Sequence, residues 1–355
     1  MMRILITLPY IVVYGKSVNP YTKSLAEGLK SAGNLVTCSI DDFWQDCCDY
    51  DIVFIQWPDT FNDFARTFGI ERIAGRMDYF KKKGIKTVIT CHNLHPHNNN
   101  QTTKEIYDLL YSKVDAFHHM GESSYHSLSQ LYPEKYHFIV PHHVADILFD
   151  SHSNQLEDRE YLHIPPQDIV IASFGEFRNS EEKRMFLQMG SDIRHQEITL
   201  LAPRMSIGRF YNGRNIVKTL QYLIQRSQAK RLKIKYKGTL LSEEEQRRWL
   251  SAADIVFIQR KDILNSGNVP LAFSQGKIVV GPQVGNVGSI LKETHNFLFD
   301  PNNRQSVKNA VTDAIEAHKT TRLGQQNLEY AKKNWATEKV CSEICHHLHL
   351  LKNIR

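Results

Sequence analysis

The sequence lacks several features that would quickly assign it to a class of protein. No apolar run reaches the roughly 18 residues that a membrane-spanning helix needs. The six cysteines show no spacing typical of a disulfide framework, which suits a reducing cytosol. The opening segment MMRILIT lacks the small-residue cleavage site of a signal peptide, so we interpret it as a first strand. No Gly-x-Gly-x-x-Gly follows that strand, which argues against a Rossmann-type oxidoreductase. We therefore expect a cytoplasmic protein.

Charge of either sign is present in only modest excess. The net charge is +6, from 44 Lys and Arg against 38 Asp and Glu, and it is too dispersed for a nucleic-acid interface. Two basic stretches, Lys81–Lys83 and residues 229–237 (AKRLKIKYK), fit contact with an anionic membrane or a phosphorylated ligand, or else ordinary solvated faces. Peripheral contact with the inner face of the membrane stays open, and no nucleic-acid partner is expected.

The hexapeptide DIVFIQ occurs twice, as Asp51–Gln56 and as Asp254–Gln259. Around both copies, short apolar β-branched segments alternate with helical patterns, which is typical of a parallel sheet covered by helices. The first helix is predicted to be capped by Asn19, with Pro20 at its first position. Ligands of such sheets bind beyond the carboxyl ends of the strands, where Trp57 and Arg260 would follow the two copies.

These patterns predict an α/β protein with two Rossmann-like, doubly wound domains that face a cleft. The 355 residues are enough for two such cores. We expect an N-terminal domain over residues 1–160, completed by a C-terminal helix at 335–355 that packs back on it, and a C-terminal domain over 161–334.

The second half carries the sharper candidates for ligand binding. A strand over 168–177 leads through Gly175 and Arg178 into a helix that contains Lys183. A glycine turn, a helix N-terminus and two cations can together hold a diphosphate, although an ordinary solvated first turn has the same appearance. Further on, Ser266, Gly267 and Asn268 form a turn before a short buried helix, and such turns also hold phosphate oxygens.

The order of these motifs resembles glycosyltransferases of the GT-B fold, and within them the family-4-type group that uses nucleotide sugars. The resemblance is carried by GEFRNSEEK (175–183), AADIVFI (252–258) and the segment from Ser266 to Val280 (SG…LAFSQGKIVV). The first half contributes DIVFIQWP (51–58), TCHNLHPH (90–97) and VPHHV (140–144). The likeness extends over nearly the whole chain.

The resemblance implies roles for particular residues. The donor diphosphate would be bound in the second half, and the residues expected there are Gly175, Arg178, Lys183, Ser266, Gly267 and Asn268. His92 would lie near the transferred sugar, and Trp57, Asn93 and His97 would lie on the acceptor side in the first half. The sequence departs from the family in one respect: Leu271 stands where many members carry the ribose-binding Glu of a Glu-x7-Glu motif, and no Glu lies between Lys261 and Lys292. We interpret this as a sub-branch that uses the Ser-Gly turn instead.

Metal binding is not predicted. His92, His95 and His97 have spacings that fit no familiar zinc pattern, and an active-site loop is the favoured interpretation over a structural loop or a metal site. Cys341 and Cys345 favour one face of a docking helix. We expect no cofactor besides the nucleoside-diphosphate sugar that serves as donor.

For the reaction, the resemblance implies retention of configuration, with the leaving phosphate helping to deprotonate the acceptor. Asp59 and Glu122 are the carboxylates expected near the cleft, and either can serve as a base if the enzyme inverts. The prediction is a hexosyltransferase-type enzyme that uses a glycan or lipid-linked saccharide acceptor in surface polysaccharide biosynthesis. Two alternatives remain: a sugar-nucleotide epimerase on the same fold, and a catalytically idle subunit that only binds nucleotide sugars.

Overall fold

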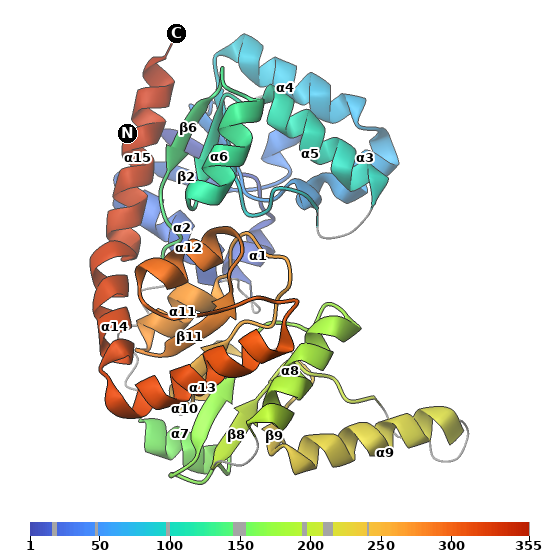
Figure 1. The fold of residues 1–355 in the computed structure, drawn as a ribbon. Helices are drawn as coiled ribbons and strands as arrows, with labels where there is room; N and C mark the ends of the chain where they lie inside the picture. Colours follow the sequence, from blue (N-terminus) through green and yellow to red (C-terminus); the bar gives the residue numbers. More distant parts are fainter. Residues whose placement is uncertain are drawn as a thin grey trace. The chain divides into compact units, whose positions relative to one another are not determined.

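A computed structural model describes residues 1–15, 20–46, 49–96, 100–144, 154–193, 197–208, 216–239 and 241–354 (Figure 1). The chain forms two compact units, one made of Met1–Asp146 with Lys333–Arg355 and the other of Ile147–Lys332. The predicted boundary at residue 160 differs from this division. The helix α7 (Gln155–Tyr161) belongs to the second unit because it packs on α10 (Glu243–Ala252) and because Arg159 forms a buried ion pair with Asp254.

The first unit is a six-stranded parallel sheet with the strand order β2-β1-β3-β4-β5-β6. Its strands are β1 (Arg3–Ile6), β2 (Leu35–Cys38), β3 (Ile52–Ile55), β4 (Lys86–Thr90), β5 (Ala116–His119) and β6 (Tyr136–Ile139). Its helices are α1 (Tyr10–Tyr14), α2 (Pro20–Ser31), α3 (Asn62–Phe68), α4 (Glu71–Lys83), α5 (Gln101–Lys113), α6 (Glu122–Leu131) and α15 (Thr337–Asn353), with short 3-10 turns η1 (Asp42–Trp44) and η2 (Pro58–Phe61). Asn19, the predicted cap of α2, lies outside the described residues.

Both faces of this sheet are covered, because successive residues of a strand point to opposite sides. Ile52 and Phe54 of β3 pack in a core with α2 and α15, and Val53 and Ile55 pack in another core with α4 and α5. The C-terminal helix lies close against α2, since a Cβ at Gly28 would be only 2.5 Å from the Sγ of Cys341. This docking accounts for the cysteine-bearing face of α15.

The second unit is a six-stranded parallel sheet with the order β12-β11-β10-β7-β8-β9. Its strands are β7 (Ile169–Ala172), β8 (Ile198–Leu201), β9 (Ile234–Lys235), β10 (Ile255–Phe257), β11 (Ile278–Pro282) and β12 (Phe297–Phe299). Besides α7 and α10, its helices are α8 (Ser180–Asp192), α9 (Ile216–Arg231), α11 (Asn268–Ser274), α12 (Gly285–Glu293), α13 (Arg304–Thr320) and α14 (Leu323–Asn334), which ends at the boundary between the units. The helices α8 and α13 bury their apolar sides in one core with the sheet.

The two copies of DIVFIQ occupy the same place in the two sheets. Asp51 bonds β1 twice: its backbone N–H donates to the carbonyl of Arg3 at 2.8 Å, and its carboxylate accepts the N–H of Arg3 at 2.8 Å. Asp254 makes the same two bonds with Val170 of β7, at 2.9 and 2.8 Å. Each copy is therefore the strand that pairs with the first strand of its unit, across the point where the strand order reverses. Ligands of doubly wound sheets bind at such switch points. Gln56 and Gln259, which end the two copies, therefore lie where a ligand is expected.

The prediction of two doubly wound α/β domains is confirmed by these two parallel sheets with helices on their faces. Among the described residues, no helix combines the length and the apolar composition that a bilayer crossing requires.

Candidate functional site

In the first unit, four side chains meet at the carboxyl edge of the sheet. Thr7 follows β1, Gln56 and Trp57 follow β3, and His92 follows β4. The Trp57 ring stacks on His92, with centroids 4.1 Å apart and planes at 17°. Tyr21 of α2 meets the edge of the His92 ring at 5.1 Å. The predicted residues Trp57 and His92 are thus brought into direct contact.

Gln56 is fully buried at the centre of this group, and only half of its amide is satisfied. Its Oε1 accepts hydrogen bonds from the Tyr21 hydroxyl at 3.2 Å and from His92 Nε2 at 3.3 Å. Its Nε2 has no partner in the described part of the chain, and neither has the buried hydroxyl of Thr7. An unsatisfied buried polar group costs about 1–3 kcal/mol, so two of them at one switch point indicate a place for a polar ligand or water.

The matching glutamine of the second unit behaves differently. Gln259 is also buried, but its Oε1 accepts from the Ser173 hydroxyl and its Nε2 donates to the carbonyl of Gly175 at 3.0 Å. The same residue in the same hexapeptide is therefore fully bonded by the protein in one unit and half-bonded in the other. The open amide belongs to the first unit alone.

The histidines around this edge are neutral at physiological pH. Removal from water lowers the pKa of His92 well below its ordinary value, and it lowers the pKa of His118 and His142 to about 4 and that of His143 to about 3. The carbonyl of Val140 accepts from His118 Nε2 at 2.9 Å, which leaves Nδ1 to accept from the Thr90 hydroxyl at 3.2 Å. A neutral His92 can donate or accept a hydrogen bond, but it does not supply a positive charge.

The predicted carboxylates lie at the ends of neighbouring strands of the first unit. Asp59, in η2 after β3, accepts a hydrogen bond from the Tyr107 hydroxyl at 2.9 Å. Glu122 begins α6 after β5, and its exposed carboxylate lies 3.4 Å from His126 Nε2. Both are therefore on the carboxyl edge of the sheet, but Asp59 is held by α5 and Glu122 is on the surface.

The segment that follows β4 is described in part. The backbone carbonyl of Asn93 accepts from the Tyr111 hydroxyl at 2.8 Å, so this residue is tied to α5. His95 is exposed, and His97 lies outside the described residues. Within the described ranges, no three His, Cys, Asp or Glu side chains come together as metal ligands would.

In the second unit, the switch point between β7 and β10 gathers two arginines beside a glycine. A Cβ at Gly175 would lie 3.0 Å from Arg260 Nη2 and 3.1 Å from Gln259 Nε2, so the backbone passes directly beside these side chains. Arg260 donates to the carbonyl of Glu176 at 2.8 Å and forms an ion pair with Glu182. Burial lowers the pKa of Arg260, and the charge of Arg178 lowers it further.

Glu182 is bonded by the side chain of Arg260 and by the backbone of Arg178. Its Oε2 accepts from Arg260 and also from the backbone N–H of Arg178, at 2.8 Å. The pKa of Arg260 is thus lowered by burial and by the charge of Arg178, and raised by the carboxylates of Glu182 and Glu176. Arg260 was expected at this ligand edge because it follows the repeated hexapeptide, but it was not named among the residues that bind the diphosphate.

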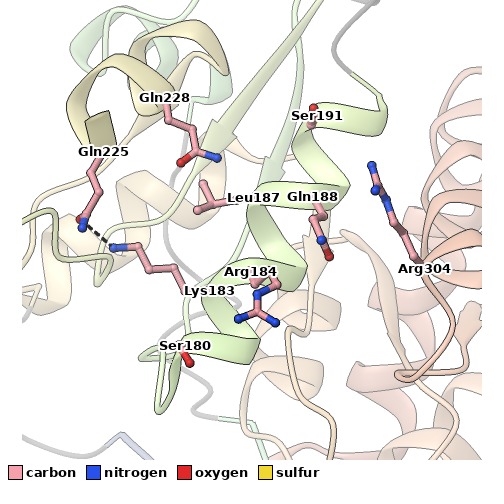
Figure 2. Close-up of a pocket in the computed structure, with 9 residues that line it drawn as sticks. All are labelled: Ser180, Lys183, Arg184, Leu187, Gln188, Ser191, Gln225, Gln228 and Arg304. Carbon is pink, nitrogen blue, oxygen red and sulfur yellow. Dashed lines mark hydrogen bonds between the residues drawn. The ribbon is translucent and has the colours of Figure 1, made fainter. Parts of the chain in front are cut away.

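Lys183 does not join the arginines. Its Nζ donates to Gln225 Oε1 at 3.0 Å (Figure 2). It also donates to the carbonyl of Ser206 at 2.8 Å. These bonds lie in an open cavity of about 460 Å³ between α8 and α9, whose lining also includes Arg184 and Arg304. Partial burial lowers the pKa of Lys183. The two predicted diphosphate ligands thus have different surroundings: Lys183 is bonded to α9, whereas the charge of Arg178 acts on Arg260.

The Ser-Gly turn is formed as the sequence predicts. The Ser266 hydroxyl accepts from the backbone N–H of Asn268 at 3.3 Å, and α11 begins at Asn268. Gly276 ends the segment with a positive φ of 63° before β11. Leu271, at the position where the resemblance expects a glutamate, is buried in α11.

Comparison with known proteins places the fold. No family model matches the sequence, and no curated protein does. Among solved structures, a sucrose-phosphate synthase from Thermosynechococcus elongatus is similar, with a TM-score of 0.73, 12% identity and 99% of each chain covered. HepE from Anabaena in complex with UDP-glucose is similar with a TM-score of 0.71 and 14% identity, covering 99% of this chain and 100% of HepE. A glycosyltransferase from Rickettsia africae gives a TM-score of 0.67 at 14% identity, covering 100% and 99% of the two chains. The chain therefore has the GT-B fold.

Proposed function

We propose that this protein is a GT-B glycosyltransferase that transfers a hexose-type sugar from a nucleoside diphosphate to a glycan or lipid-linked saccharide. The observation that carries the proposal is Arg260 beside Gly175 at the switch point of the second sheet, with the charge of Arg178 acting on it. The fold is shared with a glycosyltransferase and with a protein solved in complex with UDP-glucose, which supports a nucleotide-sugar donor. We assign the protein to a family-4-type sub-branch in cytoplasmic surface-polysaccharide biosynthesis.

The donor diphosphate is proposed to bind at the two arginines. Guanidinium groups bind phosphate oxygens through paired N–H bonds, and the glycine at 175 lets the backbone lie directly beside the Arg260 guanidinium. The turn at Ser266, Gly267 and Asn268 contributes its hydroxyl and backbone N–H groups. Lys183 attracts the diphosphate through its charge and does not bond it directly, because its ammonium group donates to Gln225 and to the carbonyl of Ser206.

The acceptor is proposed to bind at the edge of the first sheet. Sugar hydroxyls both donate and accept hydrogen bonds, so they can satisfy the Nε2 of Gln56 and the hydroxyl of Thr7. Trp57 offers an aromatic ring next to them. We assign Asn93 and His97 to the acceptor and His92 to the transferred sugar. Because His92 donates to Gln56 and stacks on Trp57, it also fixes the direction of both side chains.

The reaction is proposed to proceed with retention and without a metal ion. The arginines stabilise the negative charge that develops on the leaving diphosphate. A phosphate oxygen of the leaving group then takes the proton of the acceptor hydroxyl as the new glycosidic bond forms. Asp59 is the better candidate base for an inverting reaction, because Glu122 lies on the surface beside His126.

Calorimetric titration with UDP, GDP, ADP and CMP tests the donor site. Removing a charge-assisted contact to phosphate costs roughly 1.5–3 kcal/mol, so Arg178→Ala should weaken binding at least about tenfold. The matched control is Arg184→Ala, an exposed arginine of α8 that lines the cavity in Figure 2. Binding that is lost in the control instead would place the diphosphate in that cavity. If no nucleotide binds the wild-type protein, the proposal is wrong.

One observation favours a second candidate, a nucleotide-sugar-binding subunit without catalytic activity. The buried Leu271 occupies the position of the family's ribose-binding glutamate, so a ligand contact of the resembled enzymes is missing. Slow hydrolysis of the bound sugar nucleotide, measured as release of free sugar, separates the two. Turnover by the wild-type protein excludes the idle subunit.

A further inference from the structure

The helix α9 (Ile216–Arg231) exposes an apolar face. Ile216, Val217, Leu220, Leu223 and Ile224 are 79%, 66%, 56%, 47% and 57% exposed. Leu220, Leu223 and Ile224 follow Ile216 by four, seven and eight residues, and Val217 precedes Leu220 by three. This spacing puts all five on one side of the helix. Large exposed apolar stripes on a soluble unit mark sites of interaction.

The opposite side of α9 faces the second unit, and it is mostly polar. Gln225 accepts the hydrogen bond from Lys183, and Ala229 is the only buried residue of the described helix. A surface helix normally turns its apolar side to the core, as α8 does with Met185, Phe186 and Met189. The orientation of α9 is the reverse, and Figure 1 shows the helix extending away from the sheet beside β9. Its apolar side is therefore available to a partner outside the unit.

The charges of this region have one sign. The sequence contains no Asp or Glu between Glu197 and Glu243, and every charged side chain of α9 is Lys or Arg. Arg226, Lys230 and Arg231 make no ion pair with any other residue that the structure describes. Further along, Lys233 and Lys237 are neutralised by Asp168 and Glu245, at 3.1 and 2.5 Å. Unbalanced positive charge thus remains on the helix itself.

We propose that α9 docks the protein on an anionic lipid bilayer, with its apolar face in the headgroup region. A helix with an apolar side, basic flanks and no acidic residue is the form that binds in the interface of a negatively charged membrane. A second copy of the chain fits less well, because two such helices would bring like charges together. This inference goes beyond the proposed function, and it holds whether or not the protein turns over a nucleotide sugar.

Vesicle co-sedimentation of the full chain, without nucleotide, tests the docking. We expect binding to vesicles of phosphatidylcholine with phosphatidylglycerol and little binding to phosphatidylcholine alone. The variant Leu220→Gln/Leu223→Gln/Ile224→Gln should bind at least about tenfold more weakly, because three apolar side chains no longer leave water. Exchanging Arg226, Lys230 and Arg231 for Gln should weaken binding about fivefold for each charge removed.

A matched control carries Leu35→Gln, Leu131→Gln and Leu156→Gln, three exposed leucines that lie outside α9. It should bind as the wild-type protein does. Leu223→Trp provides a second readout that needs no polar substitution: its fluorescence should shift to shorter wavelength only with anionic vesicles.

Three outcomes overturn the proposal. The wild-type protein does not bind anionic vesicles, or it binds neutral ones equally well, or the α9 variant binds as tightly as the control. A dimer in light scattering that the α9 variant converts to a monomer, without vesicle binding, assigns the face to a second copy of the chain instead.

Discussion

Asp51 and Asp254 begin the two copies of DIVFIQ, and exchanging each for Asn should have very different effects. Both carboxylates accept the N–H of a neighbouring strand at 2.8 Å, and an Asn side chain can keep that bond. The ion pairs differ. Asp254 is 5% exposed and lies 2.6 Å from the guanidinium of the buried Arg159. Asp51 is 27% exposed and lies 2.8 Å from Lys352, which is 43% exposed.

The magnitudes follow from burial. In Asp254→Asn the Arg159 guanidinium stays buried without its countercharge, and breaking such a pair costs about 3–5 kcal/mol. In Asp51→Asn the Lys352 ammonium group returns to water, so the loss should not exceed about 1 kcal/mol. The two substitutions remove the same charge from the same motif, and each is therefore the control for the other.

Hydrogen exchange followed by mass spectrometry resolves the two units, which need not unfold together. Peptides over β7 and β10 should exchange more than about 100-fold faster in Asp254→Asn. Peptides over β1 and β3 should change by no more than about fivefold in Asp51→Asn. Equal, small changes in both variants would show that the buried pair contributes no more than the exposed one and would refute the reasoning.

Two further predictions concern the first unit. Thr7→Val removes a buried hydroxyl without a partner, so the free energy of unfolding from thermal denaturation should stay unchanged or rise by about 1 kcal/mol; a clear loss would mean that the hydroxyl is already bonded. The depressed pKa values of His118, His142 and His143 mean that below about pH 6.5 the unfolded chain takes up protons that the folded unit refuses. Stability should therefore fall, by up to about 1.4 kcal/mol per pH unit for each histidine, until the folded pKa values near 4 and 3 are reached. Urea unfolding between about pH 7 and pH 5 measures this, and a flat profile would contradict it.

Much of the fold follows from local patterns in the sequence. The IVFI segments predict buried parallel strands. Ser242 followed three residues later by Glu245 is the sequence pattern of a capping box, and the two residues form one at the start of α10. The sequence predicts strands at 198–203 (ITLLAP) and 231–238 (RLKIKYKG), but it did not predict the helix α9 between them. Its apolar periodicity is present, but a pattern of this kind cannot tell whether the stripe faces a core or the outside.

The candidate site was predictable only where neighbours in sequence are also neighbours in space. Gly175 and Arg178 follow β7 directly, and the sequence places them at its end. Arg260 joins them because β10 pairs with β7, a consequence of strand order that no local motif contains. Lys183 was paired with Arg178 from spacing alone, but the turn of α8 directs it to Gln225. The open amide of Gln56 depends on what surrounds it, since Gln259 in the same hexapeptide is satisfied.

The docking of α15 on α2 also sets an order of events during synthesis. Leu25 and Leu29 of α2 are fully buried in a core that includes Ile344 and Leu348 of α15. While the ribosome makes residues 147–336, on the order of ten to forty seconds, this side of the nascent first unit has no cover. The second unit can complete its own core during that time, because its strands and helices are contiguous in the chain. The N-terminal unit therefore begins to fold first and finishes last. Until α15 is made, the exposed apolar side of α2 is where a chaperone would bind.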